Sequence, residues 1–267
     1  MPNRGLKPAP TLMGEGGFSV LLGNPPWERI KLQEEEFFAS RSPLVAQAKH
    51  KSERGQRIQW LAQGMLARHI YPELEHSTQI CGAEQQLFAE FIAARRGAEA
   101  ASVFAHDSGR YPLTGVGDVN TYALFAETFF QLLAPNGRAG FIVPTGIATD
   151  DSTKAYFEAV SQSGRLVSLV DIENRERLFP AVDSRMKFCL LTLGLSPSAD
   201  FVCFATRMEH LADPRRHFQL TPEEFSLLNP NTRTCPVFRS QMDAELTKKI
   251  YRNVPVLIRE EDTHDPG

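Results

Sequence analysis

Short apolar runs alternate with longer amphipathic stretches along much of this chain. Apolar runs that end at turn-forming residues predict strands, and they occupy residues 18–23, 138–143, 166–171 and 186–193. A helix is predicted after Asp118, a plausible N-cap, because apolar residues recur there at the 3.6-residue period until Pro135-Asn136-Gly137. A second helix is predicted from Asp151 or Ser152 to about Gln162. This order predicts an α/β fold with a mostly parallel sheet, in which the strand 186–193 pairs with 166–171.

The remaining segments predict further regions around this sheet. Residues 1–17 are polar and rich in Gly and Pro, and we expect a flexible lead-in. Residues of about 32–117 carry many Ala, Gln, Glu, Leu and Arg and predict a helical insertion. The character changes after Pro197, so residues 198–267 are expected to begin a second region, with a strand at 201–206 and helices after Thr221 and at about 240–252.

Composition excludes several classes of protein. The chain has 267 residues, a net charge of −3 and 42% hydrophobic residues, which is ordinary for a globular protein. No run approaches the roughly 18 apolar residues of a membrane span, and the first residues lack the apolar core of a signal peptide, so a cytoplasmic location is expected. The four cysteines are scattered, which predicts free, buried thiols and no metal site.

The most informative motif is Asn24-Pro25-Pro26-Trp27, directly after the first predicted strand. Ligands of open α/β sheets bind at this edge. The prolines keep the loop in one shape, Asn24 offers an acceptor and a donor, and Trp27 offers a flat face. Such a set suits an enzyme that holds a planar amine, for example a flipped adenine. An ordinary strand-ending turn is the alternative interpretation, since Asn is a common turn residue.

The stretch FSVLLGNPPWERIK (18–31) resembles the catalytic motif of DNA amino-methyltransferases, (Asn/Asp/Ser)-Pro-Pro-(Tyr/Phe/Trp), and among them the N6-adenine-specific enzymes. It is most similar to the large methylases of type IIG restriction–modification and BREX-like phage-defence systems. Supporting segments are GDVNTYALFAETFFQLLAPNGRAGFIVPTGIATDD (117–151), LVSLVDIENRERLFP (166–180), KFCLLTL (187–193) and NPNTRTCPVFRS (229–240). The resemblance implies a partial Rossmann-like methyltransferase sheet, mostly parallel with a terminal antiparallel strand. It also implies methyl transfer from S-adenosylmethionine to N6 of adenine in double-stranded DNA.

The resemblance covers only the second half of such a domain. In the family the cofactor binds in the first half, at a Gly-rich turn after the first strand, and the catalytic loop follows the fourth strand. Here the loop follows the first strand, and the segment before it is too short for three strands with crossovers. The glycines at 14–17 precede a strand and those at 115–117 follow none, so neither cluster matches the cofactor turn. We therefore expect a fragment, poor in cofactor binding alone, with a separate chain as a possible source of the cofactor-binding half.

The resemblance also assigns roles to single residues. Asn24 and the Pro25 carbonyl would accept hydrogen bonds from the adenine amine, with Pro26 shaping the loop and Trp27 stacking on the base. Phe179 would form a second wall of the base pocket, although a core position is nearly as well supported. A run of cations beside the loop would contact DNA phosphates or simply form a solvated helix face: Arg41, Lys49, Lys51, Arg54 and Arg57.

Two other functions remain open from the sequence. The chain is also compatible with a non-catalytic fragment that binds DNA or a partner, because it lacks the cofactor half. Methyltransferases acting on protein glutamine or on RNA share Asn-Pro-Pro-aromatic loops, although the helical insertion and the later matching segments argue against them. No chemistry is assigned to residues 229–240, and Asp150-Asp151 is interpreted as a helix cap.

Overall fold

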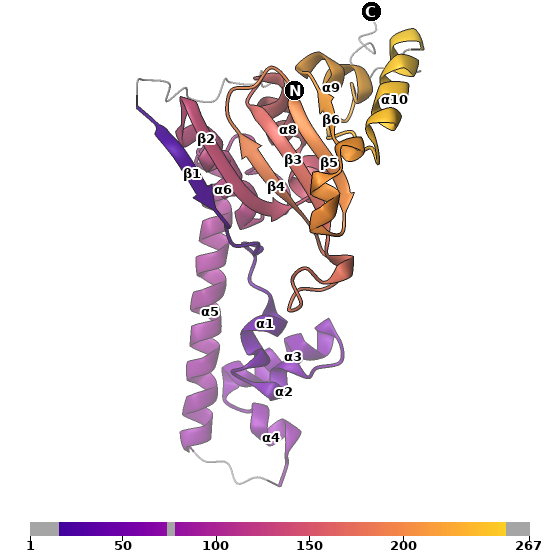
Figure 1. Ribbon diagram of the computed structural model, residues 1–267. Helices are drawn as coiled ribbons and strands as arrows, with labels where there is room; N and C mark the ends of the chain where they lie inside the picture. Colours follow the sequence, from indigo (N-terminus) through magenta and orange to yellow (C-terminus); the bar gives the residue numbers. More distant parts are fainter. Residues whose placement is uncertain (1–15, 74–77, 255–267) are drawn as a thin grey trace, which may run out of the picture. The chain divides into compact units, whose positions relative to one another are not determined.

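The computed structural model describes residues 16–73 and 78–254. They form two compact units. The sheet unit contains the described residues up to Glu28 and from Gly109 onward, and the helical unit contains those from Arg29 to Ser108 (Figure 1). Of the expected lead-in 1–17, only Gly16 and Gly17 are among the described residues.

One six-stranded sheet organises the sheet unit. Its strands lie in the order β1-β2-β4-β3-β5-β6, with bounds β1 Phe18–Gly23, β2 Leu133–Pro144, β3 Leu166–Glu173, β4 Lys187–Leu193, β5 Ala199–Ala205 and β6 Phe218–Leu220. β1 is parallel to β2 and β3 to β5, whereas β4 is antiparallel to both β2 and β3. β6 is a terminal antiparallel strand on β5. The expected α/β fold with a mostly parallel sheet is confirmed.

Helices cover one face of this sheet. They are α6 Thr121–Leu132, α7 Gly146–Thr149, α8 Lys154–Gln162, α9 Pro222–Leu228 and α10 Gln241–Asn253. Their apolar residues pack with those of the strands into the main core, which buries Ala126, Phe141, Tyr156, Phe157 and Phe201. Full burial of one large side chain stabilises the fold by about 1.5–3 kcal/mol. This cluster is therefore the main source of stability in the sheet unit.

The opposite face carries a smaller apolar cluster. Its buried members are Ile172, Phe188, Val202 and Ala205, and Ile142, Val170 and Leu190 are only partly buried against them. All of these residues lie on strands, and the α-helices described for the sheet unit contribute their buried residues to the other cluster. In Figure 1 this face of β3 and β4 is turned forward, with α6 and α8 behind the sheet.

The helical unit has a core of its own. It consists of α1 Glu34–Ala39, α2 Pro43–Ala46, α3 Lys51–Gln63, α4 Leu66–Ile70 and the 30-residue α5 Thr78–Asp107. Phe38, Leu61 and Phe91 are buried at its centre. The helical insertion expected at about 32–117 is thus present, with slightly narrower bounds. In the part of the chain that is described, no helix is long and apolar enough to cross a membrane.

Several boundaries differ from those that the sequence predicts. β2 begins at Leu133 and includes Pro135-Asn136-Gly137, which the sequence predicts as a turn. The expected division after residue 197 falls inside one sheet, because β5 pairs with β3 and β6 pairs with β5. Strand pairing between distant segments leaves no local mark, so the change of composition at Pro197 was misleading. The N-cap of α6 is Asn120 and not Asp118: Asn120 has an extended backbone, and its side chain accepts a hydrogen bond from the Tyr122 amide.

A histidine fastens the start of β6 to β5. His217 Nδ1 lies 2.8 Å from Asp200 Oδ2, and its Nε2 lies 2.9 Å from the Leu211 carbonyl. The Leu211 hydrogen bond and the Asp200 carboxylate raise the pKa of His217, against the effect of partial burial. Only the imidazolium can donate at both nitrogens. The charged form therefore stabilises this corner.

We expect His217 to make stability depend on pH. A pKa raised by folding contributes stability that is fully present below the unfolded value of about 6.5 and is lost as pH rises through the folded value. Urea unfolding at about pH 6 and about pH 8 should show a larger loss of unfolding free energy for the wild type than for His217→Gln. Equal losses in the two proteins would contradict this assignment.

Candidate functional site

The motif Asn24-Pro25-Pro26-Trp27 leaves the carboxyl end of β1, as the sequence predicts. Because β1 and β2 are parallel, Asn24 lies at the same sheet edge as the end of β2. Asn24 and Pro26 are exposed, Pro25 is buried and Trp27 is half-buried. In the described part of the chain no hydrogen bond engages the Asn24 side chain, so its amide is available to a ligand.

The first residue of α6 fixes this loop. Thr121 Oγ1 lies 2.8 Å from the Pro26 carbonyl, to which it donates, and accepts from the Glu28 amide at 3.1 Å. The Thr121 amide in turn donates to the Glu28 carbonyl at 2.9 Å. The hydroxyl thus joins two residues on either side of Trp27 to a helix that is anchored in the core. No local signal in the sequence marks Thr121 for this role, because 93 residues separate it from Glu28.

Trp27 is held at both its polar edge and its ring. Its Nε1 donates to the Ile142 carbonyl at 3.3 Å, near the end of β2. Its ring lies 6.3 Å from that of Phe188, the second residue of β4, which is buried. The indole therefore has one orientation while remaining half-exposed beside Asn24.

Phe179 contacts the same buried ring. Its side chain is 47% exposed and packs edge-on against Phe188, with the ring centroids 5.3 Å apart. Trp27 and Phe179, which lie 152 positions apart in the numbering, are thus brought onto one phenyl ring. In the sequence, Phe188 is only one apolar residue of a predicted strand, and no local signal marks its contacts with Trp27 and Phe179.

A single buried amide shapes the loop that carries Phe179. Asn174 is fully buried after β3, and its Nδ2 donates to the carbonyls of Phe179 and Val182, each at 3.0 Å. Its Oδ1 accepts from the Phe179 amide at 3.0 Å. A buried amide that is satisfied on both sides resists displacement, because each broken bond would leave an unpaired polar group. Phe179 is therefore exposed on a loop of defined shape.

A basic pocket lies on the same β3–β4 connection. It has a volume of about 310 Å³ and is lined by Glu173, Arg175, Ser184, Arg185 and Lys187. The Glu173 carboxylate is nearly buried and pairs with Arg175 at 2.6 Å and with Lys187 at 2.7 Å. Arg185 pairs with Asp183, and these hydrogen bonds lower the pKa of Asp183 to about 2. Cations therefore outnumber the acid in the pocket lining.

The other cations singled out from the sequence lie in the helical unit and are largely engaged there. Arg54 pairs with Glu34 at 3.1 Å and with Glu35 at 2.6 Å, two acids of α1 that the local charge run did not reveal. Arg57 pairs with Glu53, and the Arg41 guanidinium lies 4.5 Å above the ring of Phe37. Lys49 and Lys51 are exposed. A contact of these residues with DNA stays a prediction.

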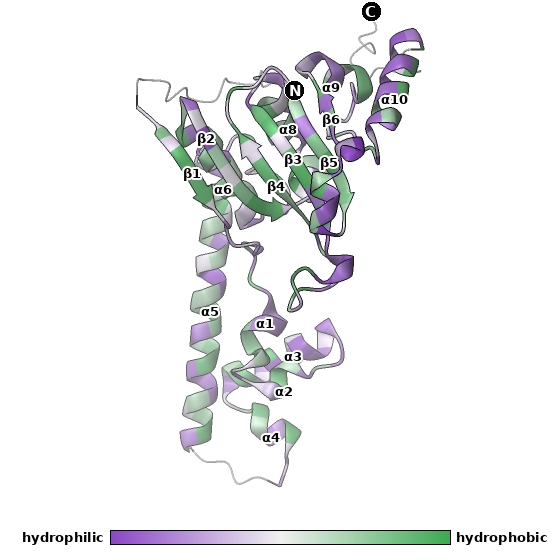
Figure 2. Ribbon diagram, in the orientation of Figure 1, coloured by the Kyte–Doolittle hydropathy of each residue, from purple (hydrophilic) through white to green (hydrophobic). Residues whose placement is uncertain are grey.

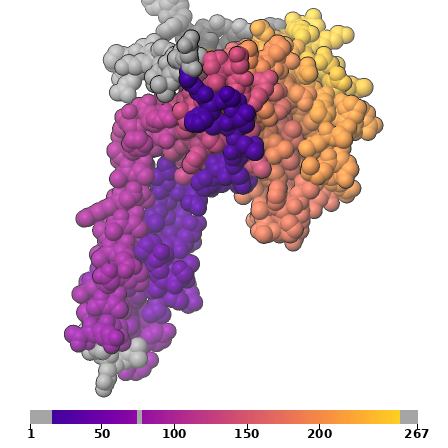
Figure 3. Space-filling model, turned by 60° about the vertical axis from the view of Figure 1, so that its left-hand side comes forward, coloured from indigo at the N-terminus to yellow at the C-terminus, as the bar shows by residue number. Residues whose placement is uncertain are grey.

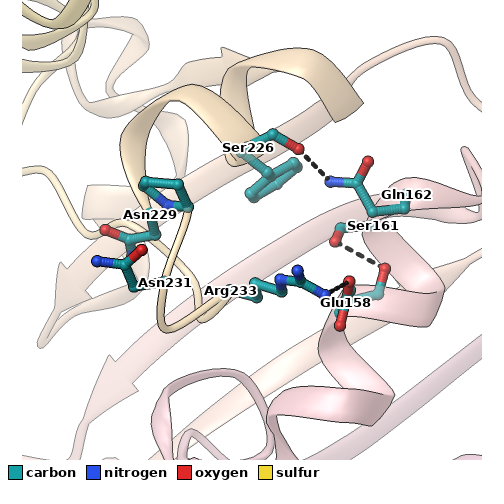
Figure 4. A pocket seen from close by; sticks show the side chains of 9 residues that line it. Glu158, Ser161, Gln162, Ser226, Asn229, Asn231 and Arg233 are labelled. Carbon is teal, nitrogen blue, oxygen red and sulfur yellow. Dashed lines mark hydrogen bonds and ion pairs between the residues drawn. The ribbon is translucent and has the colours of Figure 1, made fainter. Parts of the chain in front are cut away.

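A second pocket, of about 280 Å³, lies between α8, α9 and the loop after α9 (Figure 4). Arg233 of this loop pairs with Glu158 at 2.5 Å, and the Gln162 amide donates to Ser226. Asn229 closes the loop, since its side chain donates to the Thr234 carbonyl at 2.9 Å. None of the candidate residues named above lines this pocket. Within residues 229–240, the structure thus shows a loop-closing role for Asn229.

Comparison with known proteins finds only weak similarity. No family model matches the chain, and no curated protein matches it. One similar solved structure, from work on complex assembly and conformational transition of the type I R-M system, shares 14% identity at a TM-score of 0.34, over 54% of this chain and 40% of that chain. Another similar structure is a modification subunit of a putative type I restriction enzyme from Vibrio vulnificus YJ016. It shares 14% sequence identity with this chain at a TM-score of 0.32, and the match covers 43% of this chain and 31% of that chain. The matches thus span less than half of those chains, and similarity this weak carries no functional conclusion.

We expect Thr121→Val to loosen the loop with little loss of global stability. One exposed hydrogen-bonding hydroxyl contributes about 0.5–1.5 kcal/mol. In a Trp60→Phe background, where Trp27 is the remaining tryptophan, iodide should quench fluorescence more strongly in the variant. Thr247→Val, which removes a similar hydroxyl on α10, is the matched control. Unchanged quenching would show that Thr121 does not hold Trp27.

We expect Asn174→Ala to release the loop that carries Phe179. The loss of its buried hydrogen bonds should lower the unfolding free energy by about 1–3 kcal/mol. Trypsin should cleave faster after the exposed Arg175 and Arg177 in the variant than in the wild type. Asn253→Ala, which removes one exposed hydrogen bond on α10, serves as the control. Equal cleavage rates would mean that other contacts define the loop.

Proposed function

We propose that this chain supplies the catalytic-loop half of a DNA methyltransferase that transfers a methyl group from S-adenosylmethionine to N6 of adenine in double-stranded DNA. Restriction–modification or phage defence in the cytoplasm is the biological setting that we favour. The main observation in support is the side-chain amide of Asn24, which is exposed and forms no hydrogen bond with the described residues. It lies beside Trp27, whose indole is hydrogen-bonded to Ile142 and packs against Phe188. A planar amine needs both features, an acceptor for its hydrogens and a face for its ring.

Asn24 and the prolines of the loop would orient the adenine amine, and Trp27 would stack on the base. The Asn24 carboxamide oxygen and the Pro25 carbonyl would accept the two amine hydrogens, which directs the nitrogen lone pair away from the loop. The two prolines and Thr121 would keep these acceptors in place, so that their dipoles need no rearrangement during the reaction. The amine must lose one proton as it is methylated, and water at this exposed corner would take it.

Access to adenine in a duplex requires the base to leave the stack. Trp27 would stack on the extruded ring, a contact worth about 1–3 kcal/mol by analogy with single-strand binders. Phe179, exposed on the same buried phenyl ring, would add a second wall. The basic pocket on the β3–β4 connection would accept a phosphate near the flipped nucleotide, since arginine binds phosphate oxygens in a forked geometry.

The described residues do not fit a complete site for S-adenosylmethionine. β1 is followed by Asn24-Pro25-Pro26. β2 is followed by a turn in which the Asp150 carboxylate occupies the space beside Gly146, where a Cβ atom would otherwise lie. Gly115 and Gly117 precede α6 and follow no strand. None of these places is a glycine-rich cradle between a strand and a helix. S-adenosylmethionine would supply the methyl group, and its site would come from a separate chain or from residues beyond those described.

Phe179 favours a nucleobase over the side-chain amide of a protein glutamine. Both acceptors offer an amide or amine to Asn24, but glutamine has no ring that could use a second aromatic wall. The alternative of a non-catalytic fragment makes a different prediction, because it requires no methylation that depends on Asn24. Both rivals can therefore be separated from the proposal by one genetic experiment.

We expect deletion of the gene in its source cell to remove N6-methyladenine from one recognition sequence, detected by long-read sequencing of genomic DNA. Wild type and the exposed-surface control Asn253→Ala should restore the mark. Asn24→Ala should lower the methylation rate by about 10²–10³, because oriented acceptors of this kind contribute that much to catalysis. Unchanged adenine methylation after deletion, or full restoration by Asn24→Ala, would overturn the proposal. Loss of methylglutamine from proteins instead would point to the other acceptor.

A further inference from the structure

We infer that Arg239, held on the ring of Phe204 and accompanied there by Lys187, binds a phosphate group of the DNA backbone. Arg239 belongs to residues 229–240, a segment for which no chemistry follows from the sequence. That the phosphate belongs to DNA rests on the proposed function.

A bulge near the carboxyl end of β5 carries Phe204. The pairing of β3 with β5 shifts register between Val170 and Ile172, where one residue of β3 lies opposite two residues of β5. Phe204 is one of these two, and its backbone has a φ of 58°. This left-handed conformation is unfavourable for a bulky side chain. A bulge re-aims a side chain, so the Phe204 ring points where a regular strand would not direct it.

A buried carboxylate holds Phe204 in this conformation. Asp171 of β3 is 3% exposed, and its Oδ2 accepts a hydrogen bond from the Phe204 amide at 3.0 Å. Its Oδ1 accepts from the Thr145 hydroxyl at 2.6 Å, directly after β2. Unfavourable backbone conformations persist only where the surroundings enforce them, and they cluster at functional sites. The enforced conformation of Phe204 therefore indicates a function for its side chain.

The Phe204 ring supports a cation. The Arg239 Cζ atom lies over the ring, 4.8 Å from its centroid, and the Lys187 Nζ atom lies 5.8 Å from the same centroid. Arg239 is exposed, and in the described part of the chain no carboxylate pairs with it. A guanidinium on an aromatic face keeps its N–H groups for an anion, and it binds phosphate oxygens in a forked geometry. Arg239 is therefore a positioned and uncompensated positive charge at the surface.

The segment 229–240 places Arg239 over this ring. The Cys235 amide donates to the Ala148 carbonyl at 2.8 Å, which fastens the segment to α7. The Phe238 ring packs edge-on against Phe218 of β6, with 5.2 Å between the centroids. These contacts fix the backbone before Arg239, and α10 begins just after it. The segment thus acts as a support for one exposed guanidinium.

Arg239 and Lys187 lie at the same sheet edge as Asn24. β1, β2, β3 and β5 all run in one direction, so their carboxyl ends share this edge. Lys187 precedes Phe188, whose ring supports Trp27. β5 is four strand spacings from β1, which is about 19 Å at about 4.8 Å for each spacing. One turn of duplex DNA is about 34–36 Å long, so a duplex with its adenine at Asn24 has phosphates of the same turn near Arg239.

The surface beside Arg239 is basic. Lys187 borders the basic pocket of the β3–β4 connection, whose one acid, Glu173, is already paired with Arg175 and Lys187. In Figure 2 the short helical turn of this connection is purple, beside the mostly green strands β3 and β4, and in Figure 3 the salmon-coloured atoms of the connection lie on the surface. A row of cations suits the row of phosphates on a DNA strand, whereas one free phosphate needs only one of them.

The first experiment measures binding of a fluorescein-labelled DNA duplex to the full chain by fluorescence anisotropy, over a range of sodium chloride concentrations. Arg239→Gln should weaken binding about tenfold, equally for different sequences, and should lower the salt slope by about one phosphate contact. Arg252→Gln, which removes an exposed guanidinium near the end of α10, is the matched control and should bind as the wild type does. Equal affinity and salt slope in Arg239→Gln and the control, or no duplex binding by the wild type, would overturn the inference.

Competition tests the source of the phosphate. Inorganic phosphate, exchanged for chloride at constant ionic strength, should leave duplex binding by the wild type unchanged. Weaker binding by the wild type in phosphate, with no such loss in Arg239→Gln, would assign the site to a free phosphate and contradict the inference.

Two further variants test the positioning role of Phe204. Phe204→Leu removes the aromatic face and should weaken duplex binding as Arg239→Gln does, whereas Phe204→Tyr keeps the face and should bind as the wild type does. Circular dichroism checks that both variants are folded, and Arg239→Gln decides the inference by itself if either is not. Equal duplex binding by the two folded variants would show that the ring does not position Arg239.

These measurements separate the inference from the proposed function. The DNA contact holds and the function fails if Arg239→Gln weakens duplex binding while Asn24→Ala methylates adenine normally. The function holds and the contact fails if gene deletion abolishes adenine methylation while Arg239→Gln binds the duplex like the control.

Discussion

The buried phenyl ring of Phe188 is the contact on which the candidate site depends. Trp27 approaches it from the loop after β1, and Phe179 approaches it from the connection before β4. The ring is held in place, because Phe188 is buried and lies on a strand that is paired on both edges. Two aromatic side chains from distant parts of the chain thereby share one rigid support.

The side chains around the candidate site form hydrogen bonds within the chain, with the exception of Asn24. Thr121 uses its hydroxyl on both sides of Trp27, and Asn174 uses its whole amide inside the β3–β4 loop. The Trp27 indole nitrogen is bonded to Ile142. Asn24 stands apart, since its side chain is exposed and not engaged in the described part of the chain. Rigid neighbours around an unengaged amide are what an orienting role requires.

The sheet has unequal edges. At one end β6 closes against β5, and at the other β1 ends in exposed apolar side chains. One face is covered by helices, while part of the other leaves Ile142, Val170 and Leu190 half-buried. In the described part of the chain, the sheet therefore leaves apolar side chains exposed on β1 and half-buried on the face of β3 and β4.

Local patterns in the sequence were enough to predict most elements and the position of the loop from Asn24 to Trp27. The apolar runs and the 3.6-residue period located most strands and helices within a few residues, because these signals depend on neighbours along the chain. The position of Asn24 to Trp27 after β1 followed in the same way. Tertiary structure alone decided the order of the strands, the place of β4 between β2 and β3, and the inclusion of β5 and β6 in the sheet. It also decided that Arg54 meets Glu34 and that Thr121 and Phe188 support the loop, because these contacts join residues whose separation leaves no periodic trace in the sequence.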